Sequence, residues 1–290
     1  MKAIKNLIIS LVVIVTILGV AVIGGYIYVR STYGIDIFRT AEQLKILTED
    51  VDEASLCPNA YGEEDFVTMK SEIDKRFSGL IVYEKGKGYN GYSINFASLA
   101  DKSMTDSIFL TEKHVGAIAQ TVFYEQTGGK IKLGDKEVFV TVMQVDFSEI
   151  ATNGSADFNV VAKIDLTPFK ADMGGFPYKY FKKYIPDNLY VSSTVRVDKT
   201  EEDGFAYTVT HKSLTLNNLS ADDTADLFDT LNAVLKIGTA ENMNMKVGET
   251  AVNALIGTKD AIGFAYSMKA IGAKSFGFGT FSDIDLFIVY

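Results

Sequence analysis

The sequence predicts an α+β protein, with an N-terminal transmembrane helix followed by a long antiparallel sheet packed on amphipathic helices. Three observations support this fold class. The segment from Leu7 to Val29 is apolar and contains no charge. Residues 130–216 consist mainly of runs in which apolar side chains recur at every second position, a pattern typical of antiparallel strands. Residues 111–126 and 220–235 place apolar side chains three and four positions apart, which is typical of helices with one buried face.

The apolar segment is long enough to cross a bilayer. Its 23 residues form a helix of about 34 Å at ~1.5 Å per residue, against a hydrocarbon core of ~30 Å. A secretory signal peptide is the alternative, but such a peptide has a shorter apolar run and a small-residue cleavage site. Here the run continues through Tyr26 and Tyr28 to Arg30, residues that suit a membrane interface. The sequence therefore favours an uncleaved single span.

The charges that flank the span predict its orientation. Lys2, Lys5 and the amino terminus precede it, whereas the basic residues that follow it are mixed with acidic ones. Because positive charge favours the cytoplasmic side, we expect residues 1–6 to form a cytoplasmic stub and residues 30–290 to lie outside the cytoplasm. Within that external part, residues 30–106 should form membrane-proximal helices and a hairpin, and residues 107–290 the sheet with its helices. We expect these two segments to make one continuous globular domain.

The external part is acidic and has one cysteine. Only three of the 28 Lys and Arg residues lie in the first 30 positions, so residues 31–290 combine 25 basic with all 37 acidic residues, a net charge of −12. This argues against nucleic acid as a partner, since such binding relies on clustered Lys and Arg. The single cysteine, Cys57, excludes an intramolecular disulfide. A chain of this length can bury a core without one, which fits a bacterial exterior.

The membrane-proximal part is expected to contain two helices and a hairpin. Helices are predicted at residues 39–47 and 63–77, with an acidic loop at 48–62 between them. Strand-like runs at 80–83 and 92–96 flank a glycine motif of the form G-x-G-x-x-G at 86–91. A dinucleotide site would need a helix to begin at these glycines. Because a strand follows instead, we predict a flexible hairpin with a turn at Asn90-Gly91.

The remaining part is expected to alternate hairpins with helices. Thr111 should cap the helix at 111–126, and Gly128 should end it. Ser220 should cap a second helix, with Asp223 as its capping-box partner. Asn153-Gly154 is a strong hairpin signal. The final strand is apolar on both faces, which predicts a central or covered position. The strands are expected at 130–133, 136–150, 155–166, 189–197, 205–216, 261–268, 275–281 and 283–290, and a short helix at 249–256.

The two helical stripes form the candidate binding surface. Most such stripes pack into a core. The sharper hypothesis is that both helices line an apolar groove that accepts an acyl chain or another apolar ligand. The candidate groove residues are Val115, Ile118, Ala119, Val122, Phe123, Leu227, Phe228, Leu231 and Val234.

The sequence offers little support for catalysis, and no cofactor or metal is expected. His114 and His211 lack the local spacing of a zinc site. Cys57 has no evident catalytic partner and is expected to be a loop thiol. Acidic groups at 63–65, 201–203 and 222–223 keep a glycosidase open as an alternative, since that chemistry needs two carboxylates across a cleft. Solvated acids at loops and helix starts are the more ordinary interpretation, so we expect no enzyme activity.

The order of elements resembles a family of single-pass membrane proteins of Gram-positive bacteria that have a TULIP-like (tubular lipid-binding) external domain. The resemblance covers residues 107–235. It rests on Leu110-Thr111-Glu112, the strand pair at 138–150 and 158–166, the crossing Tyr184-Ile185-Pro186-Asp187-Asn188-Leu189, and the segment 214–220. It implies a long curved sheet wrapped on a helix as a half-barrel, with an apolar groove between them, and no enzyme activity.

Two functions follow as hypotheses. In the first, a membrane-anchored external domain binds a lipid-like or other apolar ligand without catalysis. In the second, the domain is a structural or interaction module of the cell envelope that binds a protein or a wall polymer. The first needs an apolar cavity, whereas the second needs only an exposed patch. A cavity lined by Ile118, Val122, Phe228 and Leu231 would favour ligand binding, and a solid core there would favour the interaction module.

Overall fold

The computed structural model describes residues 36–133, 136–171, 182–200, 204–236, 238–260 and 263–290. The predicted span from Leu7 to Val29 lies outside these residues. Among the helices of the described ranges, none has the length and apolar character needed to cross a bilayer.

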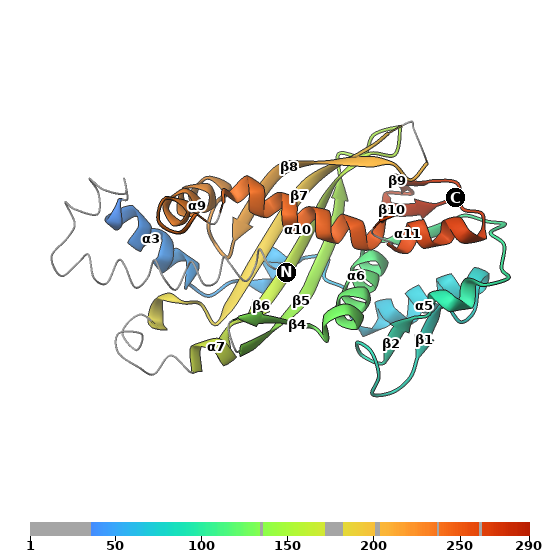
Figure 1. The fold of residues 1–290 in the computed structure, drawn as a ribbon, viewed down its shortest axis with the longest axis horizontal. Coiled ribbons are helices and arrows are strands. Elements are labelled where there is room, and N and C mark those ends of the chain that lie inside the picture. The colour runs from blue at the N-terminus through green and yellow to red at the C-terminus, as the bar shows by residue number, and fades with distance from the viewer. Residues whose placement is uncertain (1–35, 134–135, 172–181, 201–203, 237, 261–262) are drawn as a thin grey trace.

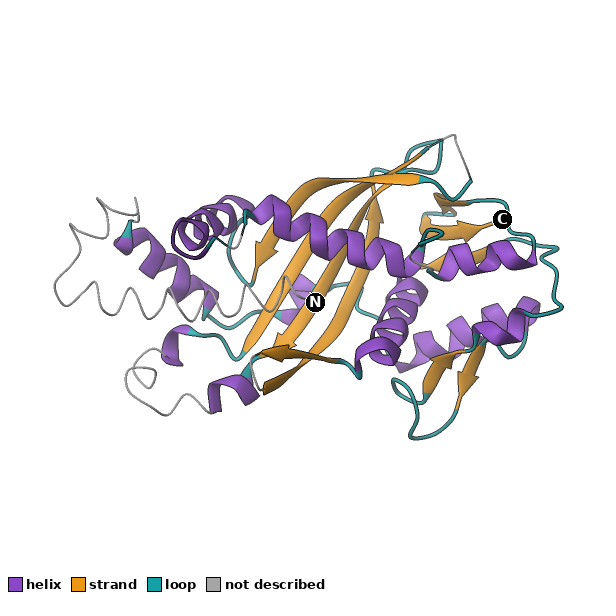
Figure 2. Cartoon of the chain, viewed as in Figure 1, coloured by secondary structure: helices purple, strands orange, loops and turns teal. Residues whose placement is uncertain are grey.

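The largest element is a five-stranded antiparallel sheet that curls into a half-barrel (Figure 2). Its strands follow one another in sequence order, so each strand pairs with the next strand along the chain. This confirms the α+β class and the long antiparallel sheet expected from the period-two runs. The strands are β4 (Lys130–Leu133), β5 (Lys136–Ser148), β6 (Ala156–Asp165), β7 (Asn188–Lys199) and β8 (Tyr207–Leu216).

A second, three-stranded sheet lies at the opposite end of the molecule from α3 (Ile37–Leu47) (Figure 1). It contains β3 (Ile108–Thr111), β9 (Phe276–Phe281) and β10 (Ile284–Val289), in the order β3-β10-β9. We call it the small sheet. Strand β10 is central, as its apolar faces predicted. A separate hairpin, β1 (Ile81–Tyr83) and β2 (Tyr92–Ile94), surrounds the glycine motif and confirms the hairpin prediction.

The helices begin and end largely where the capping signals placed them. The Thr111 hydroxyl accepts the N–H of His114 at 3.3 Å, and Gly128 ends the helix in the left-handed conformation. Ser220 accepts the N–H of Asp223 at 3.1 Å. The other α-helices of the described residues are α4 (Glu53–Leu56), α5 (Glu63–Phe77), α6 (Glu112–Thr127), α7 (Thr167–Ala171), α9 (Ala221–Leu235), α10 (Ala240–Leu255) and α11 (Phe264–Ser267), with 3-10 turns η1 (Phe96–Leu99), η2 (Lys182–Tyr184) and η3 (Met268–Ile271).

Three local predictions are corrected by the structure. The strand expected at 261–268 is wrong, because α11 and the start of η3 occupy its described residues. The helix expected at 249–256 begins nine residues earlier, at Ala240. The loop expected at 48–62 contains the short helix α4, whose first turn is capped by the Asp52 side chain. The first and third errors involve helices of only four residues, where period and propensity are weak signals.

Two β-bulges bend the long sheet. At each of them, a buried amide side chain from a helix forms a hydrogen bond with the strand backbone. The bulge in β5 follows Val142, whose N–H donates to Oε1 of Gln120 in α6 at 2.7 Å. The second bulge is at Lys212 of β8, opposite Thr194 and Val195 of β7. The carbonyl of Thr194 accepts from Nδ2 of Asn244 in α10 at 2.7 Å. Bulges leave backbone groups outside the strand ladder and increase local twist. The two helices therefore supply the partners that the curvature of the sheet requires.

Glycines let both helices approach the bulges closely. A Cβ atom at Gly116 of α6 would lie 2.6 Å from the ring of Tyr61, whose hydroxyl donates to the carbonyl of Val142. A Cβ atom at Gly248 of α10 would lie 2.3 Å from Cγ1 of Val195. Each glycine is four residues, about one helical turn, from its amide, so glycine and amide share one helix face.

The outer face of the sheet is crossed by the segment that contains α4. Glu53 accepts from Nζ of Lys163 on β6 at 2.6 Å and from the hydroxyl of Tyr190 on β7. The N–H of Asn59 donates to Oε1 of the buried Gln144 on β5 at 2.8 Å. The long sheet is therefore covered by helices on its concave side and partly by this segment on the other.

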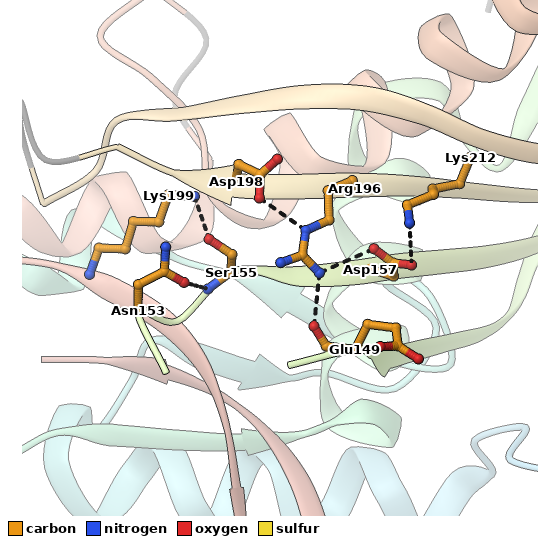
Figure 3. A network of polar contacts seen from close by, with 8 residues as sticks. All are labelled: Glu149, Asn153, Ser155, Asp157, Arg196, Asp198, Lys199 and Lys212. Atoms are coloured by element: carbon orange, nitrogen blue, oxygen red, sulfur yellow. Dashed lines mark hydrogen bonds and ion pairs between the residues drawn. The ribbon is translucent and has the colours of Figure 1, made fainter. Parts of the chain in front are cut away.

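A polar network ties the hairpin ends of the long sheet together (Figure 3). Arg196 donates to Asp157 at 3.2 Å, to Asp198 at 2.9 Å and to the carbonyl of Glu149 at 2.8 Å. Lys212 of β8 adds an ion pair with Asp157 at 3.3 Å. Because the charges of this network are paired, we assign it a structural role.

Candidate functional site

The α6 half of the predicted groove packs into the larger of two hydrophobic cores. Val115 and Ile118 are fully buried there, Val122 is 9% exposed, and Ala119 packs against the same core. This core also contains inward-facing residues of both sheets and of α5, such as Phe158, Phe287 and Phe66. We call it the first core.

The α9 half packs into a second core. Leu227, Phe228 and Leu231 have no exposed surface, and they pack with residues of α3 and of the long sheet. Phe123 of α6 is the one member of the α6 stripe that packs against this second core. The side chain of Val234 lies outside the described residues. Helix α10 contacts both α6 and α9, and its Val247 packs against both cores. The structure therefore divides the predicted groove residues between two cores.

The space around these residues is filled. A side chain with no accessible surface borders no void wide enough for a water molecule. This applies to Ile118, Phe228 and Leu231, three of the four residues expected to line a cavity. The arrangement corresponds to the solid core that favours the interaction module.

The two histidines occupy structural positions. His114 shares a hydrogen bond of 3.1 Å between its Nε2 and the Thr68 hydroxyl, and burial lowers its pKa below the usual value. Nδ1 of His211 lies 2.8 Å from Nδ2 of Asn244, beside the β8 bulge. Within the described part of the chain, no group of three His, Cys, Asp or Glu side chains is placed to hold a metal ion.

Within the described residues, the thiol and the acidic clusters form no catalytic arrangement. Cys57 is buried, and burial together with the negative charges of Glu53 and Asp146 raises its pKa to about 11. A thiol that stays protonated near neutral pH is a poor nucleophile. The acids at 63–65 and 222–223 lie in the first turns of α5 and α9, where their negative charges interact favourably with the helix dipoles. The acids at 201–203 lie outside the described residues.

The exposed feature that the sequence did not reveal is the outer face of the small sheet. Phe287 and Val289 of β10 are buried, so the alternate residues of that strand point to the other side. Their partners across the strands include Phe109, which pairs with Ile288, and Phe281, which pairs with Ile284. We call this surface the apolar face; it consists of Phe109, Phe281, Ile284, Leu286 and Ile288.

The apolar face is open and uncharged. Phe281 is 74% exposed, Ile284 52% and Phe109 42%. The other outward positions of the three strands are Thr111, Gly277 and Gly279, so none of them is charged. Contiguous exposed apolar surfaces of this kind mark interaction sites more often than single exposed residues do. The final strand was expected to be central or covered; it is central in the small sheet, and the described residues leave its outer face exposed.

Comparison of the chain with protein-family models, with curated proteins and with solved structures finds no match. The functional assignment therefore rests on the geometry of this chain.

Proposed function

We propose that this chain is a non-catalytic interaction module, tethered to a membrane by residues 7–29, that binds a protein through its apolar face. The exposed, uncharged surface of the small sheet is the observation that carries the proposal. The filled core around Ile118, Phe228 and Leu231 supports it, because an enclosed ligand would have to displace these side chains. Residues 30–290 lie outside the cytoplasm in this proposal, as the flanking charges favour.

The position and charge of the apolar face suit a protein partner. The face lies at the end of the molecule away from α3, the helix that follows the predicted span (Figure 1). It would therefore be presented away from the bilayer. The turn between β9 and β10 places the exposed carboxylate of Asp283 beside it, within a strongly acidic external part. A partner with an apolar centre and a basic rim would be complementary to this surface.

Site-specific photocrosslinking of the full chain in its native membrane tests this proposal. A photoreactive amino acid at Phe281 or Ile284 should give one discrete protein adduct. The same amino acid at Val67, an exposed apolar residue of α5, provides the matched control and should give none. Addition of Leu286→Glu should abolish the Phe281 adduct, because Leu286 lies on the central strand β10 between Ile284 and Ile288 and the substitution places a charge in the centre of the face. Equal labelling at Val67, or adducts with lipid alone, would argue against a specific protein partner.

Lipid binding remains the second candidate, since the half-barrel sheet is compatible with the TULIP-like fold that the sequence resembles. Native mass spectrometry and solvent extraction of the purified chain test it. A stoichiometric lipid that is lost on Ile118→Asp or Phe228→Asp, in variants that remain folded, would replace the interaction module by a lipid carrier. An unliganded mass, with no uptake of lipid from vesicles, would leave the interaction module as the better account.

A further inference from the structure

A basic pocket opens at the end of the molecule that contains α3. It has a volume of about 440 Å³ and is lined by Thr167, Lys170, Ala171, Lys182, Lys183 and Asp187. Three lysines thus line this pocket with one aspartate, in a chain whose formal net charge is −9. A local excess of positive charge in a concave site attracts anions.

The walls of the pocket are held together by contacts of their own. One wall is α7, and the other is the stretch from η2 to the start of β7. The N–H of Leu166 donates to the carbonyl of Asp187 at 2.7 Å, and Nζ of Lys170 pairs with Oδ1 of Asp187 at 2.5 Å. Phe169 and Tyr184, next to the lining residues, pack against the second core. The backbone that carries the lysines is therefore held by these contacts, which lowers the conformational entropy lost on ligand binding.

Two of the three lysines retain binding capacity. Lys170 is largely buried and neutralised by Asp187. Among the described residues, no carboxylate lies within ion-pair distance of Lys182 or Lys183, and Lys183 contacts only the ring of Tyr184, at 4.8 Å. Each ammonium group has three donors. Two lysines without a carboxylate partner among the described residues can both donate to the oxygens of a phosphate group, for which charge-assisted hydrogen bonds are strong.

We propose that this pocket binds a phosphate monoester or diester through Lys182 and Lys183, with the Thr167 hydroxyl as an additional donor. Its volume lies in the range of small-molecule sites, about 300–1,000 Å³, and exceeds the need of a phosphate alone. There is room for the group to which the phosphate is attached. This site is separate from the apolar face and does not depend on a protein partner.

Two sources supply this chemistry: the headgroup of an anionic phospholipid and a soluble phosphorylated molecule. Helix α3 packs against η2. If residues 7–29 span a membrane, α3 follows the span closely and brings the pocket near the headgroups. The lipid source thus rests on the predicted span, whereas the soluble source does not.

The test uses the full chain purified in a non-ionic detergent. In one arm, native mass spectrometry follows the lipid retained from an equimolar mixture of phosphatidylglycerol and phosphatidylcholine. In the other, calorimetry follows titration with glycerol phosphate. The double variant Lys182→Gln/Lys183→Gln should weaken binding about tenfold or more, because two charge-assisted contacts are lost. The control Lys85→Gln/Lys87→Gln removes two exposed lysines from the β1–β2 hairpin and should leave binding within about twofold.

The two arms separate the sources. Enrichment of phosphatidylglycerol without binding of glycerol phosphate supports a lipid headgroup. Binding of glycerol phosphate without lipid preference supports a soluble ligand. The proposal is overturned if the wild-type chain binds neither, or if both double variants weaken binding equally, which would show attraction to positive charge in general. Unchanged circular dichroism and melting temperature of the variants ensure that any loss arises at the pocket.

Discussion

Glu112 lies in the first turn of α6, where its carboxylate accepts the N–H of Phe147 from β5. Burial raises the pKa of this carboxyl group to about 7, and the negative charges of Asp146 and Asp285 act in the same direction. The hydrogen bond from Phe147 opposes these effects. The protonated form of Glu112 is therefore favoured by the folded chain across a pH range in which the unfolded chain is already ionised.

Because of the raised pKa of Glu112, we expect the free energy of unfolding to decrease as pH rises. The folded pKa is about 7 and the reference value is 4.5, so the folded state binds the extra proton between these limits. The stabilisation is complete below pH 4.5 and is lost as pH rises through 7. We expect a loss of about 1–2 kcal/mol, after allowance for solvent screening of a half-buried group. Urea unfolding of wild type and Glu112→Gln at several pH values measures it.

The Gln variant is the matched comparison, because its side-chain oxygen still accepts from Phe147. Its free energy of unfolding should vary less between pH 5 and 7 than that of the wild-type chain. Parallel pH profiles for the two chains would show that other groups cause the dependence. The sequence predicted Glu112 as a first-turn residue of a helix. It could not predict the neighbouring Asp285, because that contact depends on the pairing of β3 with β10, strands from distant parts of the chain.

Helix α10 shows why propensity failed for one element. Its first nine residues include Asn242, Asn244 and Gly248, which are poor helix formers. The sequence therefore predicted a helix only from residue 249. In the structure Asn244 donates to the carbonyl of Thr194, opposite the β8 bulge, and Gly248 allows contact with Val195, so packing on the sheet outweighs the weak propensity. The pattern at 261–268 failed in the opposite way, because a short alternating run was interpreted as a strand although its described part is helical.

Substitution of Gly248 tests this packing. Alanine would favour an isolated helix by about 1 kcal/mol over glycine. In this chain we expect Gly248→Ala to destabilise by about 1–3 kcal/mol, because the new Cβ overlaps Val195 and forces a repacking. Val195→Ala removes the overlapping methyl groups. The double variant should therefore be more stable than the sum of the single effects predicts, by at least about 1 kcal/mol in a double-mutant cycle. Simple additivity would contradict the close approach.

The buried amide at the other bulge gives an independent test. Gln120→Leu keeps the side-chain size but leaves the N–H of Val142 without its partner. We expect a loss of about 1–3 kcal/mol, the usual penalty for an unsatisfied buried donor. Gln126→Leu, at an exposed position of the same helix, is the control and should change stability by less than about 0.5 kcal/mol. Equal effects of the two substitutions in urea unfolding would show that the amide contributes nothing specific.

The two sheets are joined where the hairpin ends of the long sheet meet β9. The N–H of Phe278 donates to the carbonyl of Gly154 at 3.0 Å, and the N–H of Phe276 donates to that of Gly204 at 3.3 Å. A Cβ at Gly204 would lie 1.9 Å from the carbonyl oxygen of Lys274, so only glycine fits there. The hairpins themselves were predictable from local turn signals. Their docking on a second sheet was not, because no local pattern records which distant strand a turn contacts.

The first core extends through this junction, which predicts that the two sheets unfold together. The ring of Phe147 on β5 lies 5.9 Å from that of Phe158 and 4.8 Å from that of Phe278, between ring centres. Phe278 in turn lies 5.5 Å from Phe287 of β10. Aromatic rings from both sheets thus form one continuous cluster, and their burial is a large part of the apolar surface that stabilises each sheet.

Deletion of residues 276–290 should therefore destabilise the long sheet as well as remove the small one. The deletion takes away Phe276, Phe278 and Phe287 and exposes the partner surface of Phe147 and Phe158. We expect loss of a cooperative thermal transition in circular dichroism and loss of amide exchange protection in β5 and β6. The full-length double substitution Phe281→Ser/Ile284→Ser changes only exposed side chains and should keep both. If β5 and β6 retained their protection after the deletion, the long sheet would be stable alone, and the shared core would be only a contact between two independent units.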